Sequence, residues 1–160
     1  MLDQNSPLST SCDRRKAKAL SHVRIGICGT SAVLAFLGGE QGADKVGRLL
    51  RGARPGRVQV LSCSISLLEV FYTALRAKGE DEAVRLLALM KAWPLEWVYP
   101  DEKVLLQAGR LKASHRLSVA DALIAAVARL HHATLIHKDP KLEALKGQIE
   151  LLSLPFKAMC

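Results

Sequence analysis

Residues 23–31, Val-Arg-Ile-Gly-Ile-Cys-Gly-Thr-Ser, decide the fold of this chain. The run 23–28 is short and largely apolar, which favours a buried strand, and it ends at Gly29. Thr30 then offers an N-cap to the apolar stretch 32–37. The order strand, tight turn, helix is the first unit of an α/β fold.

The rest of the chain repeats this alternation. Further strands are predicted over 58–61, 95–99, 133–136 and 149–152, and helices over 41–51, 65–77, 80–93, 101–115 and 118–131, with a short helix starting at Asp139-Pro140. Strands that alternate with helices favour a mostly parallel sheet of four to five strands, covered on both faces by helices. The prediction is therefore a three-layer α/β/α fold.

The composition indicates one soluble globular domain. The chain has 160 residues, of which 49% are hydrophobic, and this suits a single core rather than a disordered chain. We expect residues 22–160 to form the domain and residues 1–21, which are polar and then basic, to be flexible. No apolar run approaches the roughly 20 residues of a membrane span, and the opening segment lacks the apolar stretch of a secretory signal.

Charge and cysteine content narrow the function classes. The formal net charge of +8 makes an anionic partner plausible. The cysteines form no C-x-x-C pair and are too few for a disulfide framework, which indicates a reduced, cytoplasmic setting. They are Cys12, Cys28, Cys63 and Cys160.

Three acidic residues stand in apolar surroundings or just after a strand. Glu69 and Asp121 are each the only charge within a helical turn on either side, and Asp139 follows the fourth predicted strand. A lone carboxylate on a face that should be buried is costly unless a cation or good donors compensate it. Ligands of parallel sheets bind beyond the carboxyl ends of the strands, and a set of carboxylates there suits Mg²⁺ or Mn²⁺.

Two of these acids also have a structural explanation. Ser118 and Asp121 have the spacing of a capping box, which would explain Asp121 without an active site. Asp139-Pro140 is a good N-cap followed by proline at the first helical position. Glu69 has no basic partner at helical spacing, so neither explanation extends to it. The joint pattern favours a site more strongly than any single residue does.

The ordered motifs resemble the PIN-domain family, in particular its VapC-type toxins. Four segments carry this resemblance, which covers about residues 23–152. They are Ile27-Cys-Gly-Thr-Ser-Ala-Val-Leu-Ala-Phe-Leu37, continued by Gly39 to Val46; Ser66-Leu-Leu-Glu-Val-Phe-Tyr72; Leu117-Ser-Val-Ala-Asp-Ala-Leu-Ile-Ala-Ala126; and Thr134-Leu-Ile-His-Lys-Asp-Pro140.

The resemblance implies a PIN-like fold and a Mg²⁺- or Mn²⁺-dependent endoribonuclease, with RNA as substrate. It also implies a homodimer and a small antitoxin protein as partners. Glu69, Asp121 and Asp139 would hold the metal ion and serve catalysis, with Thr30 and Ser31 in support. The departure lies at Gly29, where the family has a metal-binding aspartate. Loss of that ligand is expected to impair catalysis, since loss of outer-shell partners alone costs roughly 10–100-fold.

Basic residues supply candidate RNA contacts. Four arginines recur at every third position between 48 and 57, and another precedes the helix of Asp121; all of them could contact RNA phosphates or could be ordinary solvated surface. They are Arg48, Arg51, Arg54, Arg57 and Arg116.

Two other functions remain open from the sequence. The chain could be a catalytically inactive PIN-fold module that binds RNA or an antitoxin. A nucleotide-binding or receiver-like α/β domain is the more distant alternative, because the region after the first strand offers no pair of acids.

Overall fold

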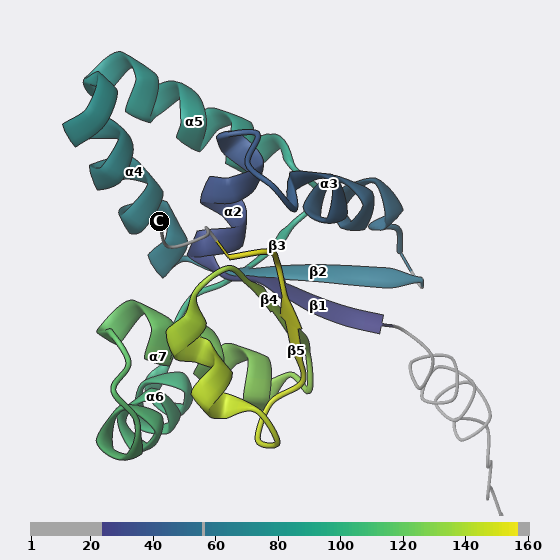
Figure 1. The fold of residues 1–160 in the computed structure, drawn as a ribbon, viewed down its shortest axis with the longest axis vertical. Helices are drawn as coiled ribbons and strands as arrows, with labels where there is room; N and C mark the ends of the chain where they lie inside the picture. The colour runs from purple at the N-terminus through teal and green to yellow at the C-terminus, as the bar shows by residue number, and fades with distance from the viewer. Residues whose placement is uncertain (1–23, 56, 157–160) are drawn as a thin grey trace, which may run out of the picture.

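A computed structural model describes residues 24–55 and 57–156 of the chain (Figure 1). The segment 1–21, predicted to be flexible, lies outside the described residues. Within them, a single sheet runs through the molecule, with helices above and below it (Figure 1).

The sheet has five strands in the order β3-β2-β1-β4-β5, and every neighbouring pair is parallel. Its strands are β1 (Arg24–Cys28), β2 (Val58–Cys63), β3 (Glu96–Val98), β4 (Thr134–His137) and β5 (Leu151–Ser153). The predicted α/β class and the parallel sheet are confirmed. The observed strands differ from the predicted ones by one or two residues at most ends, which is the usual uncertainty of such boundaries.

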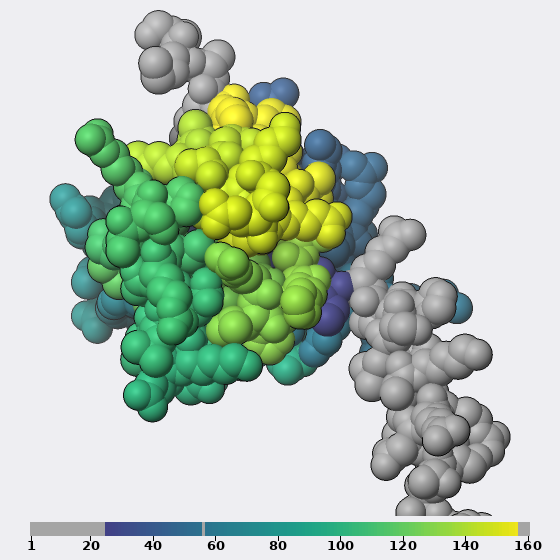
Figure 2. Space-filling view, turned by 90° about the horizontal axis from the view of Figure 1, so that it is seen from below, coloured from purple at the N-terminus to yellow at the C-terminus, as the bar shows by residue number. Residues whose placement is uncertain are grey.

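Two groups of helices cover the two faces. One face carries α2 (Thr30–Leu37), α3 (Ala43–Gly52), α4 (Ile65–Lys78) and α5 (Glu80–Ala92); the other carries α6 (Glu102–Ser114), α7 (Val119–Leu130) and the 3-10 helix η1 (Pro140–Leu145). Figure 2, seen from the side of α6 and α7, shows this face built from the C-terminal half of the described chain. The three-layer α/β/α prediction is confirmed. None of the helices in the described ranges is long and apolar enough to cross a membrane.

The central strands are buried on both faces. Ile27 and Leu135 point into the core beneath α6 and α7, whereas Cys28 and Ile136 point into the core beneath α2 to α5. A strand buried on both faces has no polar side, which explains the continuous apolar runs in the sequence. α7 lies close to the sheet because Ala122 and Ala125 to Ala128 present small side chains that are almost fully buried.

One capping prediction was wrong. Gly29, not Thr30, is the N-cap of α2, and Thr30 is the first residue of the helix. The turn after β1 is therefore one residue tighter than predicted. As a result, the Thr30 hydroxyl does not cap α2 and is available to partners from another helix.

Replacing Leu61 by alanine should destabilise the fold strongly. Leu61 in β2 is fully buried, so Leu61→Ala leaves a cavity in the core and is expected to lower the free energy of unfolding by about 2–5 kcal/mol. Urea unfolding followed by circular dichroism measures the change. The control is Leu106→Ala on α6, where the side chain is 55% exposed, and we expect a change within about 0.5 kcal/mol. Equal effects of the two substitutions would contradict the assigned core.

Candidate functional site

The sheet has its switch point between β1 and β4. From β1 the chain builds β2 and β3 on one side, and it later returns to place β4 and β5 on the other side. Ligands of parallel sheets bind in the crevice that opens beyond the carboxyl ends of the two strands at such a point. Here β1 ends at Cys28 and β4 ends at His137. Gly29, Lys138 and Asp139 directly follow these strands.

Gly29 closes the end of β1 and begins α2. Its backbone N–H donates to the Ile136 carbonyl at 2.9 Å, which extends the pairing with β4 by one bond. Its φ of −68° and ψ of 157° are ordinary extended values, so the backbone does not require glycine. A Cβ atom would lie 3.2 Å from the Ile136 oxygen, so this hydrogen-bonded carbonyl must shift by a few tenths of an ångström to admit it. The backbone angles at position 29 therefore accept an L-residue, but the space beside it is tight.

Glu69 projects from α4 and is only partly exposed. Burial raises the pKa of its carboxyl group, a hydrogen bond with Thr30 works in the opposite direction, and the negative charge of Asp121 raises the pKa further. The Thr30 and Ser66 hydroxyl oxygens lie 2.9 Å apart. This contact between the two hydroxyls joins α2 to α4 beside the Glu69 carboxylate.

Asp121 lies in the first turn of α7. The Ser118 hydroxyl accepts from the Asp121 backbone N–H at 3.0 Å, and it donates to the Asp121 carboxylate at 2.6 Å. The predicted N-cap at Ser118 is confirmed. Asp121 nevertheless acts on Glu69 through its charge, which contributes to the raised pKa of Glu69. The structure therefore brings Glu69 and Asp121 into one electrostatic environment, at the end of the sheet where α4 and α7 begin.

Asp139 follows β4 and caps η1. Its carboxylate accepts from the Lys141 backbone N–H at 2.9 Å, with Pro140 as the next residue, as the sequence predicted for an N-cap. The imidazole of His137, which is fully buried, lies with Nδ1 3.0 Å from the Asp139 carbonyl oxygen. Burial lowers the pKa of His137, while the charges of Glu143, Asp139 and Asp121 act in the opposite direction. The charges of two of the three predicted acids, Asp121 and Asp139, therefore act on the His137 imidazole.

Ser31 and Lys138 join the ends of β1 and β4. The Ser31 hydroxyl accepts from the Lys138 backbone N–H at 2.9 Å. The Lys138 ammonium donates to Glu40 at 2.8 Å and to the Gln41 carbonyl at 3.2 Å, and its side chain is only 7% exposed. This largely buried ion pair attaches the loop after α2 to the loop that carries Asp139.

The donor set suits a hard cation only in part. Carboxylates and hydroxyls are the oxygen ligands that Mg²⁺ and Mn²⁺ take, and the repulsion between Glu69 and Asp121 is what a cation between them would relieve. Among the described residues, however, no three His, Cys, Asp or Glu side chains come close enough to hold a metal ion. Asp139 is held by its capping bond, and Gly29 contributes no ligand. The type of ligand fits, whereas the number falls short.

The predicted arginines lie in two different places. Arg116 is exposed in the connection before α7, near the N-terminus of the helix that carries Asp121. Two of the other four belong to α3 and two to the turn before β2. They therefore lie toward the end of the sheet at which the strands begin, away from the carboxyl ends (Figure 1). The four are Arg48, Arg51, Arg54 and Arg57. Arg48 is bound to Asp44 at 2.7 Å.

Two participants were given no role in the sequence analysis. Ser66 stands one helical turn before Glu69, and this spacing already makes it a neighbour of the carboxylate on the same face of the helix. The ion pair of Lys138 with Glu40 has no local signal, because the two residues are 98 positions apart.

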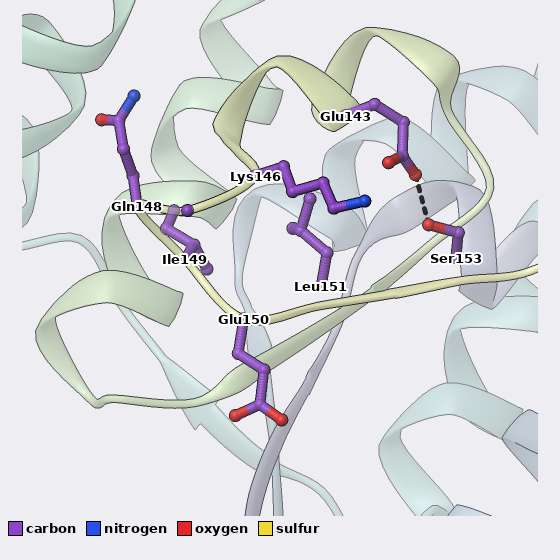
Figure 3. Close-up of a pocket in the computed structure, with 8 residues that line it drawn as sticks. Glu143, Lys146, Gln148, Ile149, Glu150, Leu151 and Ser153 are labelled. Atoms are coloured by element: carbon purple, nitrogen blue, oxygen red, sulfur yellow. Dashed lines mark hydrogen bonds between the residues drawn. The ribbon is translucent and has the colours of Figure 1, made fainter.

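Two surface cavities lie near these elements. One, of about 430 Å³, is bordered by Ser31, Glu40, Lys138 and Phe156, and it adjoins the switch point. The other, of about 470 Å³, lies beside the edge strand β5 (Figure 3). In Figure 3 the Glu143 carboxylate is hydrogen-bonded to Ser153, and Gln148 and Glu150 point outward. None of the predicted site residues lines this second cavity.

Comparison with known proteins supports a common fold. The family model of the PIN domain matches residues 27–148. VapBC2 from Rickettsia felis, solved with a DNA fragment from its promoter, is similar at 20% identity and a TM-score of 0.65, covering 82% of this chain and 99% of that chain. VapC20 from Mycobacterium tuberculosis, a toxin that cleaves the sarcin-ricin loop, is similar at 21% identity and a TM-score of 0.61, covering 79% and 97%. DNA-bound VapBC from Salmonella typhimurium gives 14% identity and a TM-score of 0.63, covering 82% and 98%. No curated protein matches the chain.

Removing the Thr30 hydroxyl should raise the pKa of Glu69. The hydrogen bond from Thr30 stabilises the ionised carboxylate, so Thr30→Val is expected to raise the pKa above its value in the unmodified protein. A ¹³C NMR titration of the glutamate carboxyl carbons measures it. Thr73→Val, at an exposed position of α4, is the matched control and should leave the titration unchanged. An unchanged Glu69 titration in Thr30→Val would show that Thr30 does not donate to this group.

Neutralising Glu69 should stabilise the folded state at neutral pH. The folded-state pKa of Glu69 is raised, so its contribution to stability is full below the unfolded-state pKa and is lost as the pH rises through the folded-state pKa. Glu69→Gln is therefore expected to raise the urea midpoint at pH 7, by an amount that shrinks toward acidic pH. Glu80→Gln, at an exposed position in α5, serves as control. A lower midpoint in Glu69→Gln at pH 7 would argue against the electrostatic cost assigned to this carboxylate.

Proposed function

This chain belongs to the PIN-domain family, and we propose that it is a VapC-type toxin, a metal-dependent endoribonuclease impaired by Gly29. The observation that carries the proposal is the pair Glu69 and Asp121. Both are partly buried beyond the carboxyl ends of the strands; burial is the main cause of the raised pKa of Glu69, and the charge of Asp121 raises that pKa further. A repelling pair of carboxylates at a switch point is the arrangement that a divalent cation stabilises.

In this proposal some residues bind the metal ion and others position the residues that bind it. We propose that Glu69, Asp121 and Asp139 hold Mg²⁺ or Mn²⁺ at least in part through water, since no three such side chains of the described residues come close enough to coordinate one ion directly. Thr30 orients the Glu69 carboxylate and Ser118 orients the Asp121 carboxylate. Ser31, by accepting from the Lys138 backbone, keeps the Asp139 loop beside the end of β1. When bound, the metal ion would activate a water molecule and position the phosphodiester.

Gly29 sets the level of activity in this proposal. In the family, the position after the first strand holds a metal-binding aspartate, and Gly29 has no side chain to replace it. Removal of outer-shell partners typically costs about 10–100-fold in metal affinity or activity, so the loss of a direct ligand should cost at least as much. The absence of a ready three-residue metal group among the described residues agrees with a weakened site.

A protein partner fits the surface. The large apolar side chains Leu68, Tyr72 and Leu75 follow one face of α4 and are 59%, 44% and 40% exposed. Exposed apolar stripes of this kind are typical of protein interfaces. Because the similar structures are VapBC complexes, we propose a small antitoxin and a second copy of the chain as partners. The proposed setting is the cytoplasm, where the free thiols of Cys28 and Cys63 would remain reduced.

The second candidate is an inactive PIN-fold module that binds RNA or an antitoxin. The observation that favours it is again Gly29, together with the commitment of Asp139 to the cap of η1. The two candidates differ in whether activity returns when the missing carboxylate is supplied.

Converting Gly29 to aspartate should restore RNA cleavage. Gly29→Asp supplies the missing ligand, the backbone angles accept an L-residue, and an N-cap aspartate adds a favourable interaction for α2. We expect Mg²⁺- or Mn²⁺-dependent cleavage of labelled RNA to rise at least about 10-fold over the unmodified chain. A further Asp121→Asn change should abolish the gain.

The matched control is Gly29→Asn. Asparagine has the same shape and the same Cβ contact with the Ile136 oxygen, but it carries no charge. Urea unfolding of both variants verifies that they fold. If Gly29→Asp folds and cleaves RNA no better than Gly29→Asn, the nuclease proposal fails and the binding module is favoured.

A further inference from the structure

The excess positive charge of the described fold is concentrated in one segment. Residues 43–58 carry five basic side chains and one acidic side chain, which is half of the formal net charge of +8. Residues 24–42 and 59–156 together carry thirteen basic and twelve acidic side chains, so they are nearly balanced. A general solubility charge would be spread over the surface. A local excess instead indicates an anionic partner at this place.

Three arginines of this segment are exposed and carry no ion pair with another described residue. They are Arg51, Arg54 and Arg57, which we call the basic surface. Arg48 is not included, because its guanidinium is paired with Asp44. The charges of the basic surface are therefore available to phosphate groups, which arginine binds well through its planar fork of donors.

The backbone holds two of these arginines in a defined turn. The Arg57 N–H donates to the Arg54 carbonyl at 3.1 Å, and Arg54 and Val58 exchange bonds of 3.2 and 3.3 Å. Arg51 lies in the last turn of α3, its guanidinium beside Gly47. Backbone hydrogen bonds that fix Arg54 and Arg57 reduce the conformational entropy that the backbone of these residues loses on binding.

The basic surface lies across the sheet from the carboxylates. It precedes the first residue of β2, whereas α4, which carries Glu69, follows the last residue of the same strand. In Figure 1, α3 accordingly lies over the end at which β1 and β2 begin, and α4 starts at the other end. β2 has six residues, which at about 3.3 Å each separate the two places by roughly 20 Å.

We propose that the basic surface is a second RNA-binding surface, which holds the phosphate backbone of a long RNA at a distance from the carboxylate site. The proposal rests on RNA as the ligand of the proposed function. A stacked strand advances about 3.4 Å per phosphate, so an RNA must extend about six nucleotides beyond the carboxylates to reach the basic surface. The favoured substrate class is therefore long or structured RNA, and very short oligonucleotides cannot reach both places.

Binding of labelled RNA in the presence of EDTA tests the proposal without any cleavage. Fluorescence anisotropy compares fluorescein-labelled single-stranded RNAs of about 20 and about 4 nucleotides, chosen to exceed and to fall short of the estimated span. The test variant combines Arg51→Gln, Arg54→Gln and Arg57→Gln. The matched control combines Arg76→Gln, Arg110→Gln and Arg129→Gln, which removes equal charge from exposed positions of α4, α6 and α7. Circular dichroism verifies that both variants fold.

The salt dependence gives a quantitative outcome. Each arginine that neutralises a phosphate on a single strand contributes about 0.7 to the slope of log affinity against log salt. Because the test variant lacks three such arginines, a fourfold increase in salt should weaken binding of the long RNA by the unmodified protein about 20-fold more than binding by the test variant. The control variant should keep the slope of the unmodified protein, and the short RNA should not distinguish the test variant from it.

Four results would overturn the proposal: no binding of the long RNA, no loss of affinity in the test variant, equal losses of affinity in the two variants, or tighter binding of duplex DNA of the same length. These results are separate from the fate of the proposed function. If Gly29→Asp fails to cleave while the salt slope falls as expected, the basic surface stands and the nuclease fails. If Gly29→Asp cleaves and both triple variants bind alike, the nuclease stands and the basic surface fails.

Discussion

β1 is hydrogen-bonded to β2 on one side and to β4 on the other, and its side chains enter the cores on both faces of the sheet. Because β1 is paired on both sides and covered on both faces, the chain can change direction only after its last residue. The next element, α2, must therefore begin directly after the strand. Gly29 makes that turn while still donating to Ile136. Because β2 and β4 are parallel to β1, the segments that follow all three strands emerge at one edge. The position of the candidate site follows from this pairing.

The same edge is where α2, α4 and α7 begin. The N-terminus of a helix carries partial positive charge, so three of them favour acidic groups beside them. Asp121 and Asp139 use this environment directly, since they take part in the caps of α7 and η1. Negative charge can therefore gather here at a lower cost than elsewhere in the fold. The basic surface lies at the opposite end of the strands, where β2 begins.

Local patterns predicted much of this structure. β1 and β4 are apolar on both faces, and this appears in the sequence as runs of consecutive apolar residues. The capping positions of Ser118 and Asp139 follow from their short spacing to the helices that they begin. Contacts between distant segments were beyond reach. The Thr30–Ser66 hydrogen bond joins residues 36 positions apart, and the wrong cap assigned to Thr30 hid this second partner. The acids could be identified as unusual, but how they share one environment depends on the packing of α4 against α7.

The three acids differ in how far structure alone accounts for them. Asp121 and Asp139 would be useful to the fold even without a ligand, because each takes part in a helix cap. Glu69 caps nothing, is partly buried, and has a raised pKa because of burial and of Asp121. A glutamine could keep the hydrogen bond with Thr30 and would avoid both costs. A carboxylate that the fold would be better without is best explained by a ligand that needs its charge, and for this reason Glu69 carries the metal-site proposal further than the two capping aspartates do.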